Sequence, residues 1–592
     1  MLTAAEFRDR GPWLTWLDMA LDAACVSLMA ERPLRLLLVF SFAAGAAYCV
    51  WQFDVGFLLG DSPYWENPRG IVGNGWADMP TALSGYVFFQ HDSWQLPLFH
   101  VTKLGAPAGV NIIFTDSIPW VALAGRLALR ATGAPVNLYG AWTALCFVAS
   151  GAALTGLVAA LGQRNLAAAA MATVTGLTMP ALLARWGHMS LMAQFEVPLA
   201  LIFYLRNRNS RAPLRTFGEA CALSLMALWT QAYLFAMVTG IILATIAQAL
   251  SNCTLEWRDA VAGLFGVAAL ISAAIALSGY LSPHGDLAAN GFGYYSMNVL
   301  SPVVPQASGL AGALRGYILD ATRGQYEGFS YLGGGVLLLV LTTFVRQLTT
   351  LRAGFSRNPW LLVLLVGFTL FALSNIVYFG PWKILELPLS ARLAVLASMF
   401  RSSGRFFWPA MYALTALAIA AAIPLYGRRG VLLILVATLL QWIDTAPLRE
   451  TFAGRTRTPE KPHIDLAAWR TAIGKHRFVR VLPEYSCLAK PRSWNQEAAV
   501  EIELAAAFAD RPVNSVYAAR FEADCAAEQA AVPPAPSAGE LTVYLSEFVG
   551  IAGVRARAAK DDACRAGDRL VVCSNVPGEA SQLVELARTD QR

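Results

Sequence analysis

The chain has 592 residues, of which 56% are hydrophobic and only 14% are charged, and its mean hydropathy is +0.49. These values lie outside the range of ordinary soluble domains and indicate a membrane protein. The net charge of +6 comes mostly from short basic loops, so it does not indicate a nucleic-acid-binding protein.

The chain divides into three parts. Residues 1–33 mix acids with arginines and contain no clear small-residue cleavage site, so we expect a cytoplasmic amphipathic segment rather than a cleaved signal peptide. Residues 34–450 contain many apolar runs of about 20 residues, the length that crosses roughly 30 Å of hydrocarbon. Residues 451–592 contain no such run and have the charge density of a soluble domain.

Basic loops predict how the chain threads the membrane, because Lys and Arg near span ends stay on the cytoplasmic side. An even number of crossings must separate consecutive basic segments, which lie at 31–35, 162–165, 206–215, 346–358 and 426–430. This condition predicts about eleven transmembrane helices, a cytoplasmic N-terminus and a C-terminal domain outside. It also divides the apolar run 217–250 into two short helices, with the break near 229–234. Segment 114–132 remains outside as a membrane-surface or half-inserted helix in a long first outer loop, 53–137.

The C-terminal part has the pattern of a small soluble α/β domain. We expect helices at 495–509 and 550–561 and strands at 477–482, 513–518, 541–545 and 569–573. Four of the nine cysteines lie here: Cys487, Cys525, Cys564 and Cys573. An even number in a compact polar domain predicts two disulfides and an oxidising compartment, with three pairings possible and buried free thiols as the alternative.

On this topology the unusual polar residues all fall on the outer side. Polar groups beside hydrocarbon are costly, so this convergence indicates a site, although outer loops are polar in any case. The residues are Asp54, Asp61, Asp78, His91, Asp92, His100, Asp116, His188, Tyr294, Asn298, Tyr326, Glu327, Lys383, Arg401 and Arg405.

Two acids head apolar segments. Asp78 opens "DMPTALSGYVFF", where the Pro and Thr suit a helix start, and Asp116 lies in "FTDSIPW" before the surface helix. Each acid is either a helix cap or a functional carboxylate. Together they could hold a divalent cation, Mg²⁺ or Mn²⁺, or share acid–base chemistry.

Cationic side chains form the second candidate group. His188 follows Arg185 by three residues in the sequence, where two predicted spans meet. It either binds a phosphate or a sugar hydroxyl of the substrate, or only forms hydrogen bonds at the membrane interface. Arg401 and Arg405 are spaced i to i+4, which places them on one face of a helix. They form either a clamp on a lipid-linked phosphate or an anchor among lipid headgroups. The chain has no Walker loop and no HExxH helix.

The order of these features resembles that of the GT-C superfamily of membrane glycosyltransferases, and most closely a bacterial family of uncharacterised polytopic proteins within it. The similarity runs over most of residues 34–446 and more weakly over the C-terminal domain. It rests on the segments "DMPTALSGYVFFQHDSWQLPL", "IIFTDSIPW", "RWGHMSLMAQF", "GFGYYSMNVLSP", "GQYEGFSYLG" and "FRSSGRFFWP".

The resemblance implies an enzyme of the bacterial inner membrane and cell envelope. It would transfer a sugar from a polyprenyl-phosphate donor to an extracytoplasmic glycan, polysaccharide or glycolipid. The early acid of the first outer loop would be the base or a metal ligand, and Asp78 fits best, with Asp54 as the other candidate. Asp116 would be the second metal ligand. The expected substrate-binding residues are Asp116, Arg185, His188, Tyr294, Tyr326, Glu327, Lys383, Arg401 and Arg405.

Two other functions compete with glycosyl transfer. A lipid or polysaccharide transporter or flippase is the main alternative, but it would be expected to carry charged residues deep in several spans or an internal repeat, and neither is visible. An acyltransferase would depend on His188 or His91, and no second signature supports it.

Overall fold

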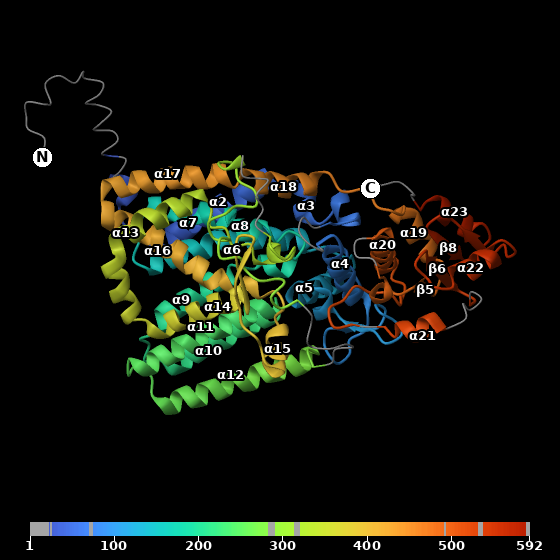
Figure 1. Ribbon diagram of the computed structural model, residues 1–592, viewed down its shortest axis with the longest axis horizontal. Helices are drawn as coiled ribbons and strands as arrows, with labels where there is room; N and C mark the ends of the chain where they lie inside the picture. The colour runs from blue at the N-terminus through green and yellow to red at the C-terminus, as the bar shows by residue number, and fades with distance from the viewer. Residues whose placement is uncertain are drawn as a thin grey trace, which may run out of the picture.

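A computed structural model describes residues 23, 26–69, 75–281, 291–312, 320–489, 493–521, 523–530 and 537–587. Residues 1–22, 24 and 25 of the predicted segment 1–33 therefore lie outside the described residues. The described chain is mostly helical, and its long helices run side by side along the longest axis (Figure 1). The C-terminal domain lies at one end of this helical bundle, with α4 and α5 between the two.

The first part of the chain builds one wall of the bundle and a long excursion beyond it. Helix α2 (Leu34–Gln52) packs against α6 (Tyr139–Ala160). The excursion between them contains, in order, α3 (Val55–Leu59), η1 (Pro63–Glu66), α4 (Gly75–His91), β1 (His100–Val101), β2 (Val110–Asn111), η2 (Ile112–Thr115) and α5 (Pro119–Thr132). The predicted surface helix corresponds to α5, whose 14 residues are too few to cross a bilayer.

The other helices complete the bundle. They are α7 (Leu166–Thr178), α8 (Pro180–Leu183), α9 (Glu196–Asn207), α10 (Pro213–Leu228), α11 (Ala232–Ser251), α12 (Trp257–Ser278), α13 (Gly334–Ser356), α14 (Pro359–Leu373), α16 (Trp408–Tyr426), α17 (Arg428–Asp444) and α18 (Ala446–Arg457). Short elements lie between them: η3 (Met189–Met192), η5 (Gln325–Gly328), β3 (Ile376–Phe379), β4 (Trp382–Glu386), α15 (Ala391–Ser398) and η6 (Ser403–Phe407).

Six helices among the described residues are long and apolar enough to span a membrane, or seven if the bent pair α17 and α18 forms one span. Each of the eleven predicted segments contains a helix or a broken helix, but several are shorter than a bilayer requires. The class of multi-helix membrane protein is therefore confirmed, and the number of eleven crossings stays a prediction.

The predicted break in the apolar run 217–250 is present. Helix α10 ends at Leu228 and α11 begins at Ala232. The Gln231 side chain caps α11 by accepting a hydrogen bond from the Tyr233 amide at 3.1 Å. Capping provides one partner for the free amide groups at a helix start, so it stabilises the break.

The C-terminal domain contains α19 (Leu466–Ile473), β5 (Phe478–Leu482), η7 (Tyr485–Cys487), α20 (Trp494–Phe508), α21 (Cys525–Ala530), β6 (Glu540–Leu545), α22 (Ile551–Ala558), β7 (Cys564–Ala566), β8 (Leu570–Cys573) and α23 (Glu579–Glu585). Its sheet has the order β5-β6-β8-β7; β5 and β6 are parallel, and the other pairs are antiparallel. The predicted α/β domain is confirmed, although α18 continues across the predicted boundary at residue 451.

One predicted strand is wrong. Residues 513–518 form only isolated bridges, in which Val513 pairs with both Leu104 of the first excursion and Val479 of β5. The segment is apolar like a strand because it lies between the C-terminal sheet and the bundle. Its backbone hydrogen bonds join two parts of the protein instead of extending one sheet.

Two disulfides join Cys487 to Cys525 and Cys564 to Cys573, with S–S distances of 2.06 and 2.04 Å. The prediction of two bridges is confirmed, and the alternative of free thiols in this domain is wrong.

Thiol counting tests this assignment in the purified protein. Under denaturing conditions, reduction should add four alkylation sites to those already reactive, because each disulfide releases two thiols. Mass spectrometry of peptides should locate all four in the C-terminal domain. No gain on reduction would contradict both bridges.

Candidate functional site

Six charged residues from separate segments gather where the bundle meets the C-terminal domain. Asp78 lies in the first turn of α4, and Asp116 follows η2. Arg185 and His188 lie in the loop after α8. Glu327 lies on η5 and Arg405 on η6. We call these six residues the charged cluster.

His188 lies at the centre of the charged cluster. Its Nε2 atom is 3.5 Å from Asp78 Oδ2 and 3.5 Å from Glu327 Oε1, and its Nδ1 atom is 3.7 Å from Asp116 Oδ2. One imidazole thus faces three carboxylates. The His188 and Asp116 side chains are 15% and 22% exposed, so the cluster is accessible on their side.

Neither acid is merely the helix cap that the sequence allowed. Asp78 lies inside α4, which begins at Gly75. The N-cap of α5 is Ile118, whereas Asp116 ends η2 in the left-handed region with a φ of 61°. The Oδ2 atom of each acid is buried without a hydrogen-bond partner, and both atoms face His188. Buried carboxylate oxygens are normally hydrogen-bonded, and here the His188 imidazole is the charged group that faces both of them.

Glu327 is held by two arginines. Its Oε2 atom accepts hydrogen bonds from Arg405 Nε at 3.1 Å and Nη2 at 2.8 Å and also contacts Arg185. Arg185 donates a further bond to the Tyr326 carbonyl at 3.0 Å. The three charged side chains are 1–7% exposed. This network connects the loop after α8 with η5 and η6.

The buried charges shift one another's protonation. Burial raises the pKa of Asp78 to about 6, although the charge of His188 opposes the shift. Burial would lower the pKa of His188, but Asp78, followed by Asp116 and Glu327, raises it to about 10. Burial would likewise raise the pKa of Glu327, but Arg405 and Arg185 hold it well below the usual range. At neutral pH the imidazole is therefore a cation among carboxylates.

The C-terminal domain reaches the cluster through Tyr517. Its carbonyl accepts a hydrogen bond from Thr81 Oγ1 at 3.0 Å, and its amide donates to Glu503 of α20 at 3.2 Å. Thr81 lies three residues after Asp78 and therefore on the same face of α4. A hydrogen bond from the Tyr517 side chain lowers the pKa of Asp78, opposing the effect of burial. The C-terminal domain thus contributes directly to the surroundings of Asp78.

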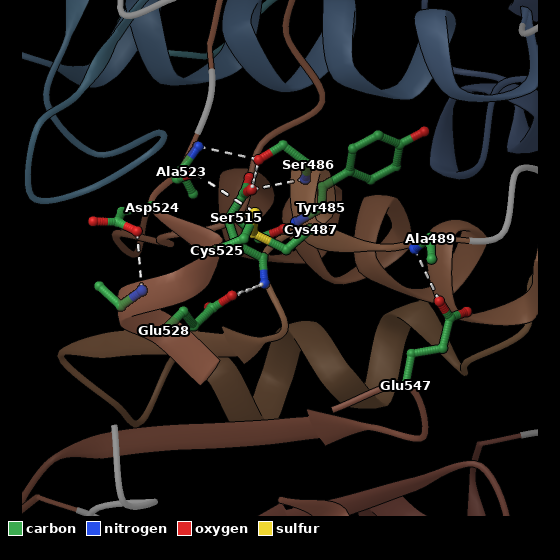
Figure 2. The surroundings of a disulfide bond; sticks show 12 residues. Tyr485, Ser486, Cys487, Ala489, Ser515, Ala523, Asp524, Cys525, Glu528 and Glu547 are labelled. Atoms are coloured by element: carbon green, nitrogen blue, oxygen red, sulfur yellow. Dashed lines mark hydrogen bonds between the residues drawn. A yellow bond between two sulfur atoms is a disulfide. The ribbon is translucent and has the colours of Figure 1, made fainter. Parts of the chain in front are cut away.

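The Cys487–Cys525 disulfide joins η7 to the start of α21, and Figure 2 shows its surroundings. Near it, the Tyr485 amide donates to Ser515 Oγ at 3.1 Å, and the Ala523 amide donates to Ser486 Oγ at 3.1 Å. The Tyr485 ring packs against the Tyr517 ring, with 4.8 Å between their centroids. The disulfide and these contacts therefore restrict the movement of the segment that carries Tyr517.

Ion pairs and a short hydrogen bond dock the domain onto the first excursion. Arg69 pairs with Glu501 in the interior, and Lys103 Nζ lies 2.7 Å from Asp510 Oδ1. Thr81 Oγ1 donates to Glu503 Oε1 at 2.5 Å. These contacts connect the two domains on both sides of Tyr517.

Several predicted site residues lie outside the charged cluster. Asp54 is exposed and caps α3 by accepting a hydrogen bond from the Phe57 amide at 3.1 Å. Lys383 is exposed on β4 and lies 2.5 Å from Glu386. Tyr294 is 42% exposed, and its carbonyl accepts a hydrogen bond from Thr322 at 2.6 Å. Tyr326 contributes its carbonyl to Arg185.

Arg401 and Arg405 do not share a helix face as the spacing predicted. Residues 403–407 form the 3-10 helix η6, which begins after Arg401. Arg405 points inward to Glu327, whereas Arg401 is exposed and lies over the Tyr295 ring at 5.6 Å. The chain is not α-helical between the two arginines, so the i to i+4 argument fails.

Sequence reasoning missed three partners of the cluster. Ser190 Oγ donates to Asp116 Oδ1 at 2.6 Å, and Gln231 Nε2 donates to the same oxygen at 3.2 Å. Tyr517 approaches Asp78 from the other domain. For Gln231, the predicted helix break was a signal in the sequence. For Ser190 and Tyr517 there was none, because their contacts with the acids form only when distant segments fold together.

The two acids expected to hold a cation both lie in the charged cluster. Within the described ranges, no group of three or more His, Cys, Asp or Glu side chains is arranged to hold a metal ion. The His188 imidazole lies between Asp78 and Asp116, facing the oxygen atoms that a cation would need. The prediction that Asp78 and Asp116 hold a divalent cation is not tested by this arrangement and stays a prediction.

The fold and the site define a multi-helix membrane protein whose small C-terminal α/β domain contacts α4 beside a largely buried charged cluster. Residues 42–446 match a family described as a domain of unknown function (DUF6311), and residues 468–575 match the C-terminal domain of the same family. The first match covers more than half of the chain, so the protein belongs to this family. No curated protein matches the chain.

A charge-removing substitution tests the central ion network. Glu327→Gln should destabilise the protein by about 3 to 5 kcal/mol, because two buried guanidinium groups lose their carboxylate. The thermal unfolding midpoint in detergent measures the effect. Glu386→Gln is the matched control, since it removes an exposed ion pair worth about 0 to 1 kcal/mol. Equal midpoints for the two variants would contradict the role of Glu327.

The pH dependence of stability tests the docking of α20. Burial raises the pKa of Glu503 to about 8 in the folded protein, although its hydrogen bond from Thr81 opposes the shift. The folded state therefore retains a proton that the unfolded state loses, and the wild type should lose stability as the pH rises from about 4.5 to 8.

Glu503→Gln should remove this contribution, because glutamine mimics the neutral acid. The midpoint of the variant should rise relative to that of the wild type between pH 5 and pH 8. Glu585→Gln changes an exposed acid of α23 and serves as the control. A difference between wild type and Glu503→Gln that stays constant with pH would contradict a protonated Glu503.

Proposed function

We propose that this protein is an integral-membrane glycosyltransferase that moves a sugar from a polyprenyl-phosphate donor to an extracytoplasmic glycan or glycolipid. The observation that carries the proposal is the accessible side of the charged cluster, where His188 and Asp116 meet the buried carboxylate of Asp78. The cluster residues lie on α4 and on short segments between the apolar helices, and the C-terminal domain binds α4 at Thr81, three residues after Asp78. A substrate with a lipid half and a sugar half requires both surroundings.

In the proposed reaction, the acceptor hydroxyl oxygen forms a bond to the anomeric carbon while the bond between that carbon and the phosphate oxygen breaks. Asp78 takes the hydroxyl proton, and the lipid phosphate leaves with the electron pair. A pKa of about 6 suits this role, because the carboxylate is mostly ionised at neutral pH yet remains basic. A positioned general base contributes about 10² to 10⁴ in rate.

The leaving phosphate needs a cation, and Arg401 fits better than Arg405. The Arg405 guanidinium is already bound to Glu327. Arg401 is exposed, and neither it nor Arg520 of the C-terminal domain forms an ion pair in the described part of the chain. Burial and the nearby charge of Arg401 lower the pKa of Arg520, which supports two unpaired cations near one another. Planar donors of this kind bind phosphate well.

We assign to His188 the positive charge that a divalent cation would otherwise supply between the carboxylates. Its imidazole bears the positive charge between Asp78 and Asp116, and it keeps the two carboxylates from repelling each other. Asp116 is in turn oriented by Ser190 and Gln231. In this proposal the protein lies in the bacterial inner membrane, with a cytoplasmic N-terminus and a periplasmic C-terminal domain.

A transfer assay tests the proposed activity. Purified protein in lipid vesicles should move a labelled sugar from a polyprenyl-phosphate sugar to an added acceptor, and Asp78→Asn should reduce the rate at least about 10²-fold. Asp54→Asn, which removes the cap of α3, is the control and should retain activity. Activity in Asp78→Asn together with loss in Asp54→Asn would transfer the role to Asp54. Movement of the lipid across the vesicle without covalent transfer would instead support a flippase.

Chelation tests the assignment of His188. Transfer should continue in EDTA, because the imidazole supplies the positive charge. Loss of activity in EDTA and recovery with Mg²⁺ or Mn²⁺ would contradict this assignment and make Asp78 and Asp116 metal ligands.

A further inference from the structure

A segment with many exposed apolar side chains follows α14. The chain turns at Ser374 and forms the antiparallel pair β3 and β4, then α15. We call residues 376–399 the hairpin–helix segment. Every residue of β4 is exposed, and α15 buries none of its residues. The exposed apolar side chains are Phe379, Trp382, Ile384, Leu385, Leu387, Leu393, Val395, Leu396 and Met399.

This segment does not suit bulk water. Trp382 is 66% exposed, Ile384 59% and Leu396 61%, and they belong to one short stretch of chain. Contiguous apolar patches of this kind are rare on soluble surfaces and mark contacts with a partner or a membrane.

The segment does not suit the hydrocarbon core either. β3 and β4 form a two-stranded sheet, whose outer edges leave backbone groups without strand partners. Such groups cost several kcal/mol each in hydrocarbon, where no water can bond them. Lys383, Glu386 and Arg392 are also exposed within it. The segment therefore needs surroundings that accept apolar side chains, backbone polar groups and charges together.

The bilayer interface provides these surroundings, and α14 leads to it. The 15 residues of α14 rise about 22 Å, which is less than the roughly 30 Å of a hydrocarbon core. Its exposed side chains Val363, Val366 and Leu370 continue the apolar surface toward the hairpin. Aromatic and cationic side chains such as Trp382 and Lys383 are typical of membrane interfaces.

We propose that the hairpin–helix segment binds the bilayer surface, with its apolar side chains at the boundary between headgroups and acyl chains. This inference does not rest on the proposed enzymatic activity. It gives Lys383 a place near lipid headgroups instead of in the substrate site.

The segment is tied to the charged cluster by hydrogen bonds. Asn298 Oδ1 accepts from the Gly380 amide at 3.0 Å, and Asn298 Nδ2 donates to the Gly380 carbonyl at 2.8 Å. Asn298 Nδ2 also donates to Gln325 at 3.1 Å, two residues before Glu327. The bound membrane surface would thus be held at a fixed position relative to the cluster.

Fluorescence quenching in vesicles tests the proposal. Trp382→Cys and Leu396→Cys are each labelled with a small fluorophore in a background whose non-disulfide cysteines are changed to serine. The vesicles are phosphatidylcholine with a nitroxide either near the headgroup or near the end of the acyl chain. Two exposed control positions are labelled in the same way: Val366→Cys in the middle of α14 and Ala526→Cys on α21.

The labels at residues 382 and 396 should lose more fluorescence to the shallow nitroxide than to the deep one. The label at 366 should show the opposite order, and the label at 526 should lose little to either. Labels at 382 and 396 that behave like the one at 526 would overturn the proposal and point to a protein partner or water. Stronger quenching by the deep nitroxide would overturn it as well. The measurement uses no sugar substrate, so its result is separate from that of the transfer assay.

Discussion

The pairing of Glu327 with Arg185 and Arg405 is the interaction on which the site depends. A buried charge without a partner is costly, so one carboxylate between two guanidinium groups fixes the three segments that carry them. His188 follows Arg185 by three residues and is held against the same carboxylate. Through His188, the network then sets the positions of Asp78 and Asp116. The arrangement explains how short loops at the ends of separate helices produce one ordered cluster.

The second constraint comes from the C-terminal domain. Glu503 and Tyr517 both bind Thr81 on α4, one turn beyond Asp78. The domain thus completes the surroundings of the carboxylate as well as covering it. The Cys487–Cys525 disulfide lies next to Tyr485, whose ring packs against that of Tyr517, so the bond is connected to the surroundings of the site through these two rings. The cluster and the domain interface therefore form one functional unit.

Local patterns in the sequence predicted much of this protein. Apolar runs predicted the helical membrane body, the even number of crossings between basic loops predicted the break in 217–250, and cysteine parity predicted two disulfides. All six residues of the charged cluster were candidates, because charges are conspicuous beside apolar segments. The roles of the individual residues were harder to predict from sequence. Arg405 lies on the 3-10 helix η6 and points inward, whereas Arg401 precedes η6 and is exposed. Tyr517 was missed because it reaches Asp78 from a segment hundreds of residues away.

A density map of the protein in a lipid nanodisc with polyprenyl phosphate added would test the central claim most directly. The account predicts phosphate density beside Arg401, with the space next to Asp78 and His188 left for the sugar. Phosphate bound away from the cluster, with Asp78 and His188 facing no part of the ligand, would contradict it.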